Sequence, residues 1–275
     1  MRLYIAQTRV CTDEDQSIRQ LEEILRRAKA QGAELTALPE MWCCPYVTTE
    51  FPRYAQPQGG SLYRKMSALA AKYELLLAAG TVPESEENSS GTRIYNTCYV
   101  FGRSGELLAK HRKMHLFDIH IEGGQHFMES ETLTAGDQIT VFDTPFGRIG
   151  LCICFDFRFP EPAMLMADKG ARLFLVPAAF NPTTGPAHWE LMFRQRAVDN
   201  QVFCVGIAPA LDPSASYHSY GHSIVADPWG RVLLQMGTAE EEQLIDVDLS
   251  QTESIRRQLP LLSARRKDIY TLKEI

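Results

Sequence analysis

The spacing of apolar side chains divides this chain into helical and extended segments. Ile18, Leu21 and Leu25 lie at helical spacing behind an acidic start, so a helix is expected over residues 13–29, ending before Gly32. Comparable spacing between turn residues predicts further helices at residues 61–73 (with Ser61 as the cap), 160–169, 187–200 and 251–259.

Short apolar runs bounded by turn residues predict strands between these helices. The runs lie at residues 3–8, 34–38, 75–82, 95–101, 107–111, 139–143, 148–154, 174–177, 202–207, 223–226, 232–235 and 243–247. Strands alternate with helices early in the chain and pair as hairpins midway and late. This order predicts an α/β protein of mixed (α+β) sheets, with two sheets covered by helices. Since no repeat or linker is evident, a single domain over residues 1–275 is expected.

Three segments lack a clear period. Prolines and a Gly-Gly pair predict a loop over residues 41–60, and a polar run predicts a turn over residues 84–92. Residues 114–136 combine little periodicity with several ionisable groups. Irregular segments of this length in compact domains are often functional, so this one is a candidate part of the site.

Composition excludes several classes of function. The chain has 275 residues, 45% of them hydrophobic and 23% charged, which is typical of a globular protein. A net charge of -6 gives no basic surface for nucleic acid, so no nucleic-acid partner is expected. No apolar run approaches the roughly 20 residues that span a bilayer, and the first residues lack the pattern of a signal peptide. We therefore expect no membrane partner and a cytoplasmic location.

Cysteine and histidine spacing argues against a metal or disulfide framework. Seven cysteines are widely spread, without a C-x-x-C pair or zinc-type spacing, which favours free thiols in a reducing compartment. The adjacent Cys43 and Cys44 next to Glu40 could be redox-sensitive, although plain loop packing is the stronger interpretation. His111 and His115 would form a metal pair on a helix, but their surroundings predict a strand end and loop, so no metal is expected.

Three residues with complementary chemistry each follow, or close, a predicted strand: Glu40, Lys113 and Cys154. In open α/β sheets the ligand crevice lies beyond the carboxyl ends of the strands. A carboxylate base and a nearby ammonium would activate a thiol and hold the oxyanion formed when it attacks a carbonyl or nitrile carbon. The trio suits acyl transfer from an amide. The competing interpretation is a core cysteine and a surface lysine with no shared role.

The same residues lie in motifs that resemble a known superfamily. The blocks L-P-E-M-W around Glu40, H-R-K-M-H-L-F around Lys113 and G-L-C-I-C-F-D-F-R-F-P-E around Cys154 are similar to the three signature blocks of the nitrilase superfamily of carbon-nitrogen hydrolases. Downstream, A-F-N-P-T-T-G-P-A-H-W-E from Ala179 and D-P-W-G from Asp227 resemble the ω-amidase branch. The resemblance covers nearly the whole chain.

The resemblance implies a fold and a division of roles. It implies a four-layer αββα sandwich, with Glu40 as general base, Cys154 as nucleophile and Lys113 as oxyanion stabiliser. It also implies that a second glutamate orients the lysine and the substrate amide. Glu129 is the expected residue for that role and Glu122 the alternative.

The branch implies a substrate class and partners. Its members hydrolyse 2-oxoglutaramate and 2-oxosuccinamate without a cofactor, and members of the superfamily typically form homodimers. Deaminated glutathione or an N-carbamoyl compound is the alternative substrate, and a catalytically silent binding protein of the same fold is the alternative function. Expected substrate-binding residues are Tyr46, Phe155 (whose backbone N–H is the implied second oxyanion donor), Arg158, Thr183 and Thr184.

Some residues depart from the branch pattern. Cys152 and Phe155 stand where glycine and tyrosine are usual, and residues 41–44 are bulkier than expected. These differences border the expected pocket, so they affect the substrate assignment more than the reaction class. Cys152 is expected to be structural. Asp156 and Arg158 are expected to touch substrate or to brace the loop after the nucleophile as an ion pair.

Overall fold

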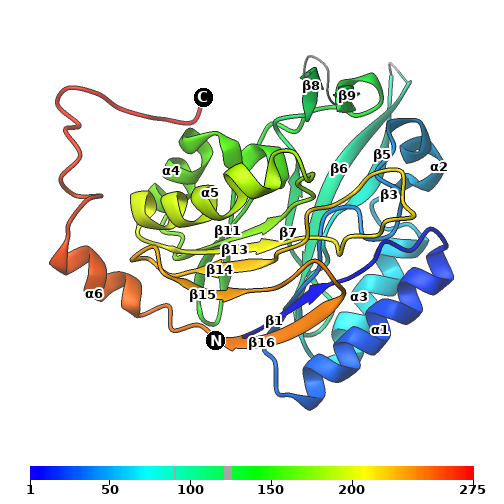
Figure 1. Ribbon diagram of the computed structural model, residues 1–275, viewed down its shortest axis with the longest axis horizontal. Helices are drawn as coiled ribbons and strands as arrows, with labels where there is room; N and C mark the ends of the chain where they lie inside the picture. The colour runs from blue at the N-terminus through cyan, green and yellow to red at the C-terminus, as the bar shows by residue number, and fades with distance from the viewer. Residues whose placement is uncertain (90, 121–125) are drawn as a thin grey trace.

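The computed structural model describes residues 1–89, 91–120 and 126–275. Two large β-sheets pack face to face, and helices cover their outer faces (Figure 1). One core cluster joins side chains from both sheets, among them Leu3 and Val100 of the first and Leu151 and Leu175 of the second. A separate cluster fills the space between the first sheet and its helices. The predicted four-layer αββα fold is confirmed.

The first sheet has eight strands within the described residues. Its order is β16 (Glu241–Asp246), β1 (Arg2–Gln7), β2 (Leu35–Ala37), β4 (Leu76–Ala78), β6 (Gly91–Phe101), β5 (Val82–Asn88) and β3 (Gln56–Pro57), with β7 (Leu107–Arg112) also on β6. Strands β1, β2 and β4 are parallel, whereas β16 runs antiparallel to β1. The parallel strands are almost wholly buried, because sheet covers one face and helix the other.

The second sheet has six described strands and a parallel centre. Its order is β10 (Thr140–Thr144), β11 (Gly147–Leu151), β12 (Leu173–Pro177), β13 (Phe203–Ile207), β14 (Ile224–Ala226) and β15 (Val232–Gln235). Strands β11, β12 and β13 are parallel to one another. A small hairpin of β8 (Asp118–His120) and β9 (His126–Met128) stands apart from both sheets.

Helices α1 (Glu14–Ala30) and α3 (Ser61–Tyr73) cover the first sheet, and α4 (Pro160–Asp168) and α5 (Gly185–Asn200) cover the second (Figure 1). The remaining helices of the described residues are the short α2 (Phe51–Tyr54), α6 (Gln251–Gln258) and three 3₁₀ turns at Thr48–Glu50, Glu129–Glu131 and Cys154–Arg158. The start of α1 follows from its sequence, because Asp13 accepts a bond from the backbone N–H of Gln16 and caps the first turn. No described helix is long and apolar enough to cross a membrane.

Two local predictions were wrong for a shared reason, a polar side chain with a distant partner. The N-cap of α3 is Gly60, because the Ser61 hydroxyl donates instead to Glu14. The polar run at residues 84–92 is not a turn but mostly strand β5, paired along its length with β6. Its Glu84 is buried and accepts two bonds from the Arg112 guanidinium, at 2.8 and 2.9 Å. Such an ion pair permits a glutamate inside a sheet.

The strand expected at residues 75–82 is interrupted at Gly80. This glycine has a left-handed φ of 58°, and a Cβ there would lie 2.2 Å from the Pro39 carbonyl oxygen. The break brings Thr81 against the loop after β2, where its hydroxyl accepts the backbone N–H of Met41 at 2.9 Å. Only glycine tolerates both this conformation and this approach. The interruption therefore fixes the backbone on either side of Glu40.

Candidate active site

Cys154 occupies a strained backbone position at the start of a 3₁₀ turn. Strand β11 was expected to reach it, but the strand ends at Leu151 and the Cys154–Arg158 turn begins three residues later. The φ of Cys154 is 44°, in the left-handed region that non-glycine residues rarely adopt. Strain of this kind persists where surrounding contacts enforce it and is concentrated at functional sites. The thiol is 5% exposed and within hydrogen-bonding reach of the Glu40 carboxylate.

Glu40 follows β2 and is fully buried. Its Oε1 accepts bonds from Asn96 Nδ2 at 2.8 Å and Lys113 Nζ at 3.0 Å. Its Oε2 accepts the backbone N–H of Ala179, just beyond β12, at 2.8 Å. The carboxylate is thus held by groups from both sheets, which fixes its direction relative to the thiol.

Lys113 follows β7 and is also fully buried. Its Nζ lies 3.0 Å from Glu40, 2.9 Å from Glu129 and 3.2 Å from the Tyr46 hydroxyl oxygen. Its backbone N–H donates to the carbonyl of Asn96 at 2.9 Å. All three ammonium protons have acceptors, so this buried charge is fully paired.

Glu129 completes the cluster from the 3₁₀ turn after β9. Its Oε1 accepts the Tyr46 hydroxyl at 2.6 Å, and its Oε2 accepts the backbone N–H of Phe117 at 2.7 Å. With Lys113 bound as well, the side chain is fully buried and saturated. The structure thus brings Glu129, Lys113 and Glu40 into contact. Glu122, the alternative for this position, lies outside the described residues.

Burial and charge decide the protonation of the cluster. Burial raises the pKa of Glu40, Lys113 lowers it and Glu129 raises it, so the pKa stays above its ordinary value. Burial would lower the pKa of Lys113, but Glu129 and Glu40 outweigh it and hold that pKa well above the usual range. Burial and the Glu40 charge raise the pKa of Cys154 well above its ordinary value. At neutral pH the resting site therefore holds an ammonium and a protonated thiol, and the thiol needs a base before it can attack.

The expected ion pair between Asp156 and Arg158 is wrong. Asp156 is fully buried and bonds to His111 Nε2 at 3.1 Å and His115 Nδ1 at 2.9 Å instead. Both of its oxygens are occupied by the chain, so it does not face substrate either. Sequence adjacency suggested the arginine, but the 3₁₀ turn directs the two side chains to different neighbours.

Arg158 is half-buried and has no carboxylate partner among the salt bridges of the described residues. Its guanidinium lies 4.5 Å from the centre of the Phe180 ring and 3.0 Å from His188 Nδ1. Burial lowers the pKa of Arg158, and among the groups that raise it Cys154 has the largest effect. A partly desolvated cation near the thiol is thus available to an anion.

The other expected binding residues differ in their placement. Phe155 lies in the first turn of the 3₁₀ segment, where backbone N–H groups lack partners within the helix. The Tyr46 hydroxyl contacts Glu129 and Lys113, so Tyr46 lies within the buried cluster of ionisable groups. Thr183 is exposed, and the Thr184 hydroxyl donates to Asn181 Oδ1 at 3.0 Å at the start of α5. Neither threonine contacts the cluster through a described hydrogen bond.

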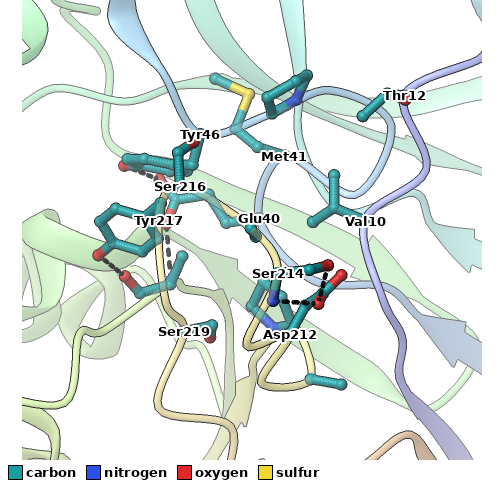
Figure 2. A pocket seen from close by; sticks show the side chains of 15 residues that line it. Val10, Thr12, Glu40, Met41, Tyr46, Asp212, Ser214, Ser216, Tyr217 and Ser219 are labelled. Atoms are coloured by element: carbon teal, nitrogen blue, oxygen red, sulfur yellow. Dashed lines mark hydrogen bonds between the residues drawn. The ribbon is translucent and has the colours of Figure 1, made fainter.

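A cavity of about 400 Å³ reaches the cluster from the side of Glu40. Figure 2 shows Glu40, Tyr46 and Tyr217 gathered on one side of it and Asp212 with Ser214 toward the other. The Ser214 hydroxyl and backbone N–H donate to Asp212, which keeps the pKa of that carboxyl below its usual value. Among the described residues, the walls of this cavity offer hydroxyls and negative charge and no arginine or lysine, and Arg158 lies outside it.

Sequence reasoning missed two residues that hold the site together. Asn96 lies in β6. Its side-chain Nδ2 donates to Glu40, and its backbone carbonyl accepts the backbone N–H of Lys113. Its only signal in the sequence was one amide side chain within the predicted strand at residues 95–101. Tyr217 packs 4.7 Å from the Tyr46 ring centre and donates to the carbonyl of Ala179. No sequence pattern marked it, because it lies in an irregular loop.

The remaining cysteines are buried. All seven are free thiols. Burial raises the pKa of Cys43 to about 12 and that of Cys152 well above the ordinary value, so both are protonated at neutral pH. Cys44 is enclosed as well, beside Met41. Protonated, enclosed thiols are poor nucleophiles, and Cys154 is the one thiol of the described site with a carboxylate in hydrogen-bonding reach.

Comparison with known proteins adds independent information. The model of the carbon-nitrogen hydrolase family matches residues 3–257. Mouse omega-amidase NIT2 is 45% identical over 99% of this chain and 97% of its own length, and the human protein of the same name is 43% identical over the same shares. Among solved structures, Saccharomyces cerevisiae Nit3, a member of branch 10 of the nitrilase superfamily, has a TM-score of 0.88 at 38% identity, covering 97% of this chain and 96% of that one.

Proposed function

This chain belongs to the carbon-nitrogen hydrolase family, and from that premise we propose that it removes ammonia from the terminal amide of a small 2-oxo dicarboxylic acid monoamide. The proposed substrates are 2-oxoglutaramate and 2-oxosuccinamate, and the product is the corresponding 2-oxo acid. The observation that carries the proposal is the buried contact of Lys113 with Glu40 and Glu129 beside the thiol of Cys154. Similarity to relatives named omega-amidase supplies the substrate class.

Acylation begins with a proton transfer. Glu40 takes the proton of the Cys154 thiol as sulfur attacks the amide carbon, so that a C–S bond forms and the carbonyl π electrons move to oxygen. When the tetrahedral intermediate collapses, the C–N bond breaks and Glu40 returns the proton to the departing nitrogen. Ammonia leaves, and a thioester remains on the enzyme.

Two donors hold the oxyanion. In the resting site Lys113 gives one proton to Glu40 at 3.0 Å. Once Glu40 has taken the thiol proton it is neutral and a weaker acceptor, so this ammonium proton turns to the oxyanion at the moment the negative charge develops. Glu129 keeps the ammonium in place, and the backbone N–H of Phe155 is the second donor.

Deacylation repeats the sequence with water. Glu40 takes a proton from a water molecule as its oxygen attacks the thioester carbon, and the oxyanion returns to the same donors. The C–S bond then breaks, the sulfur regains a proton from Glu40, and the carboxylic acid is released. Base, nucleophile and oxyanion donors are all groups of the chain, so the proposal assigns no cofactor.

Arg158 is the residue we assign to the substrate carboxylate. Its guanidinium lies close to Phe155, with 5.7 Å between its Cζ and the ring centre, and pairs with no described carboxylate. A planar guanidinium binds a carboxylate through two parallel bonds. The cavity beside Glu40, with Asp212 in its wall, suits water entry and ammonia departure better than an anion.

A panel of amides tests the substrate class. We expect wild-type protein to release ammonia fastest from 2-oxoglutaramate or 2-oxosuccinamate, and Arg158→Gln to raise KM for them by about 10- to 100-fold, since an interaction with a charged group contributes roughly 1.5–3 kcal/mol. For an amide without a distal carboxylate, Arg158→Gln is expected to change KM little. The control is Arg148→Gln, because Arg148 is exposed and pairs with Asp143. Equal losses for charged and uncharged amides would remove Arg158 from this role.

A neutral short amide or an N-carbamoyl compound is the second candidate substrate. The observation that favours it is the hydroxyl-lined, acidic cavity next to Glu40, which no described arginine or lysine lines. Preference for uncharged amides in the same panel would select this alternative. Absence of ammonia from every compound, with folded protein, would indicate a binding protein of this fold.

The pH profile tests Glu40 as the base. Glu40 must be ionised to accept the thiol proton, and its pKa is raised above the ordinary value by burial and by Glu129. We expect kcat/KM to fall with decreasing pH along a limb whose midpoint lies above about 4.3, the usual glutamate pKa. Glu40→Gln is expected to lose roughly 10²- to 10⁴-fold in rate and to lack this limb. Glu23→Gln, at an exposed site on α1, is the control, and an unchanged limb in Glu40→Gln would assign it to another group.

Three wider properties complete the proposal. Seven free thiols, the usual state of cysteine in a reducing compartment, support a cytoplasmic protein. The family model covers residues 3–257, which supports one catalytic domain. We infer a homodimer from the superfamily resemblance, to be measured by sedimentation.

A further inference from the structure

The carboxylate of Asp156 is the meeting point of five donors. Oδ1 accepts the backbone N–H groups of Met114 (3.1 Å) and His115 (2.8 Å) and the His115 ring Nδ1 (2.9 Å). Oδ2 accepts the His111 ring Nε2 (3.1 Å) and the backbone N–H of Ile153 (3.0 Å). The side chain is fully buried, so bulk solvent does not reach it.

These donors come from the two segments that carry the reacting groups. His111 precedes Lys113 by two residues, His115 follows it by two, and Ile153 directly precedes Cys154. One carboxylate therefore links the lysine segment of the first sheet to the nucleophile turn of the second. No hydrogen bond described in the structure joins the Lys113 and Cys154 side chains themselves. Glu40 contacts both side chains, and Asp156 links the backbone segments that carry them.

Asp156 is ionised at neutral pH. Burial would raise the pKa of this carboxyl, but the bonds from His111 and His115 outweigh it and hold the pKa below its usual range. An ionised carboxylate only accepts hydrogen bonds, so His111 presents Nε2–H and His115 presents Nδ1–H toward it. The three residues therefore form a defined donor–acceptor unit rather than a metal site, and no metal-type cluster occurs among the described residues.

The same carboxylate closes the strained turn. Asp156 accepts from the Ile153 N–H, and its own N–H donates to the Ile153 carbonyl at 2.9 Å. These two bonds enclose Cys154, whose φ of 44° costs on the order of 1–3 kcal/mol and needs outside support. The buried, charged anchor supplies that support.

We propose that Asp156, held by His111 and His115, is a positioning residue that fixes the Cys154 thiol relative to Glu40 and Lys113. The proposal rests on the proposed function. Asp156 acts through the backbone of Cys154 and through the lysine segment, and does not touch substrate because both its oxygens are occupied. Misplacement of a reacting atom by about 1 Å costs on the order of 10²-fold in rate, which sets the expected effect.

The test compares variants that keep or lose the donor to Asp156. His115→Asn keeps an N–H near the position of Nδ1, whereas His115→Ala removes it; the His115 side chain is 32% exposed, so both are expected to fold. Asp156→Asn removes the charge from the centre of the unit. Each variant is measured by kcat and KM for ammonia release, by the rate and pH profile of Cys154 alkylation with iodoacetamide followed by peptide mass spectrometry, and by thermal unfolding.

We expect Asp156→Asn to lose about 10²-fold and His115→Ala about 10-fold in both kcat and alkylation rate, with KM within about 3-fold. His115→Asn is expected to stay within about 3-fold of wild type. Folded Asp156→Asn and His115→Ala with unchanged kcat and alkylation would overturn the proposal, as would equal losses in both His115 variants. If Asp156→Asn does not fold, the His115 pair decides. Alkylation needs no substrate, so a wild type that releases no ammonia refutes the proposed function while this readout still tests the positioning role.

Discussion

Replacing Cys154 by alanine is expected to end ammonia release, with a rate loss on the order of 10⁶-fold, the size found when a nucleophile that acts as part of a unit is removed. In the proposed mechanism sulfur forms the bond that replaces the amide C–N bond, and no described neighbour can take its place, because Cys152 and Cys44 are enclosed and protonated. The measurement is steady-state ammonia release with thermal unfolding of the same preparation.

Stability is expected to change little in Cys154→Ala. The substitution keeps the Cβ and removes one buried sulfur, so the cost is that of a small cavity, about 1 kcal/mol. Cys152→Ala is the matched control, since this thiol is equally buried, two residues away, and lies outside the contacts of Glu40 and Lys113. It is expected to keep most of the activity. Turnover in Cys154→Ala above one part in a thousand, or loss of activity in both variants, would contradict the assignment of the nucleophile.

The way the thiol is activated follows from the charges around it. Cysteine nucleophiles beside a histidine cation are thiolates at rest. Here Cys154 faces two carboxylates and one ammonium, and its pKa is raised well above the ordinary value, by burial first and by Glu40 next. The resting site therefore keeps the proton on sulfur, and in the proposed mechanism Glu40 removes it only as substrate reacts. Such a thiol resists oxidation between turnovers, because the thiolate is the oxidisable form.

Periodicity and apolar runs in the sequence predicted the parts of the fold that depend on local pattern. Helix α1 begins and ends within a residue of the expected range, and the buried strand β12 nearly matches its prediction. The placement of Glu40 and Lys113 after strands was recognisable for the same reason. The predicted sheet–helix layering needed only the order of these elements and the superfamily resemblance.

The misses come from contacts between distant residues. Strand β5 looked like a turn because its glutamates are polar, yet Arg112 neutralises them from β7. Asp156 was paired with its near neighbour Arg158, whereas the two histidine side chains that bond it lie more than 40 residues earlier. Neither pairing can be recognised from local composition, because the sequence does not distinguish a buried charged residue from an exposed one.

Replacing Lys113 by methionine is expected to cost both activity and stability. Loss of one oxyanion donor alone accounts for about 10²- to 10³-fold in kcat, and loss of the charge adds to it. The buried contacts of the ammonium with both carboxylates add an expected loss of stability. Without the ammonium, Glu40 and Glu129 remain buried near each other, and removing one member of a buried ion pair costs about 3–5 kcal/mol.

The stability loss in Lys113→Met is expected to depend on pH in a defined direction. Lys113 lowers the pKa of Glu40, so its removal leaves that pKa raised still further in the folded state. A carboxyl with a raised folded pKa favours folding below its unfolded pKa, about 4.3, and this contribution is lost as pH rises through the folded pKa. Thermal unfolding at pH 5 and pH 8 is therefore expected to show a larger deficit relative to wild type at pH 8.

A double variant separates the two roles of the lysine. Lys113→Met with Glu129→Gln removes one carboxylate charge together with the ammonium, so the pair of like charges is gone and most of the stability at pH 8 is expected to return. Ammonia release is expected to stay at the level of the single variant, because the oxyanion donor is still missing. Equal instability of the single variant at both pH values would show that packing, not charge, holds Lys113 in place. Recovery of activity in the double variant would mean that the ammonium serves only to neutralise Glu129, and that the backbone N–H of Phe155 suffices for the oxyanion.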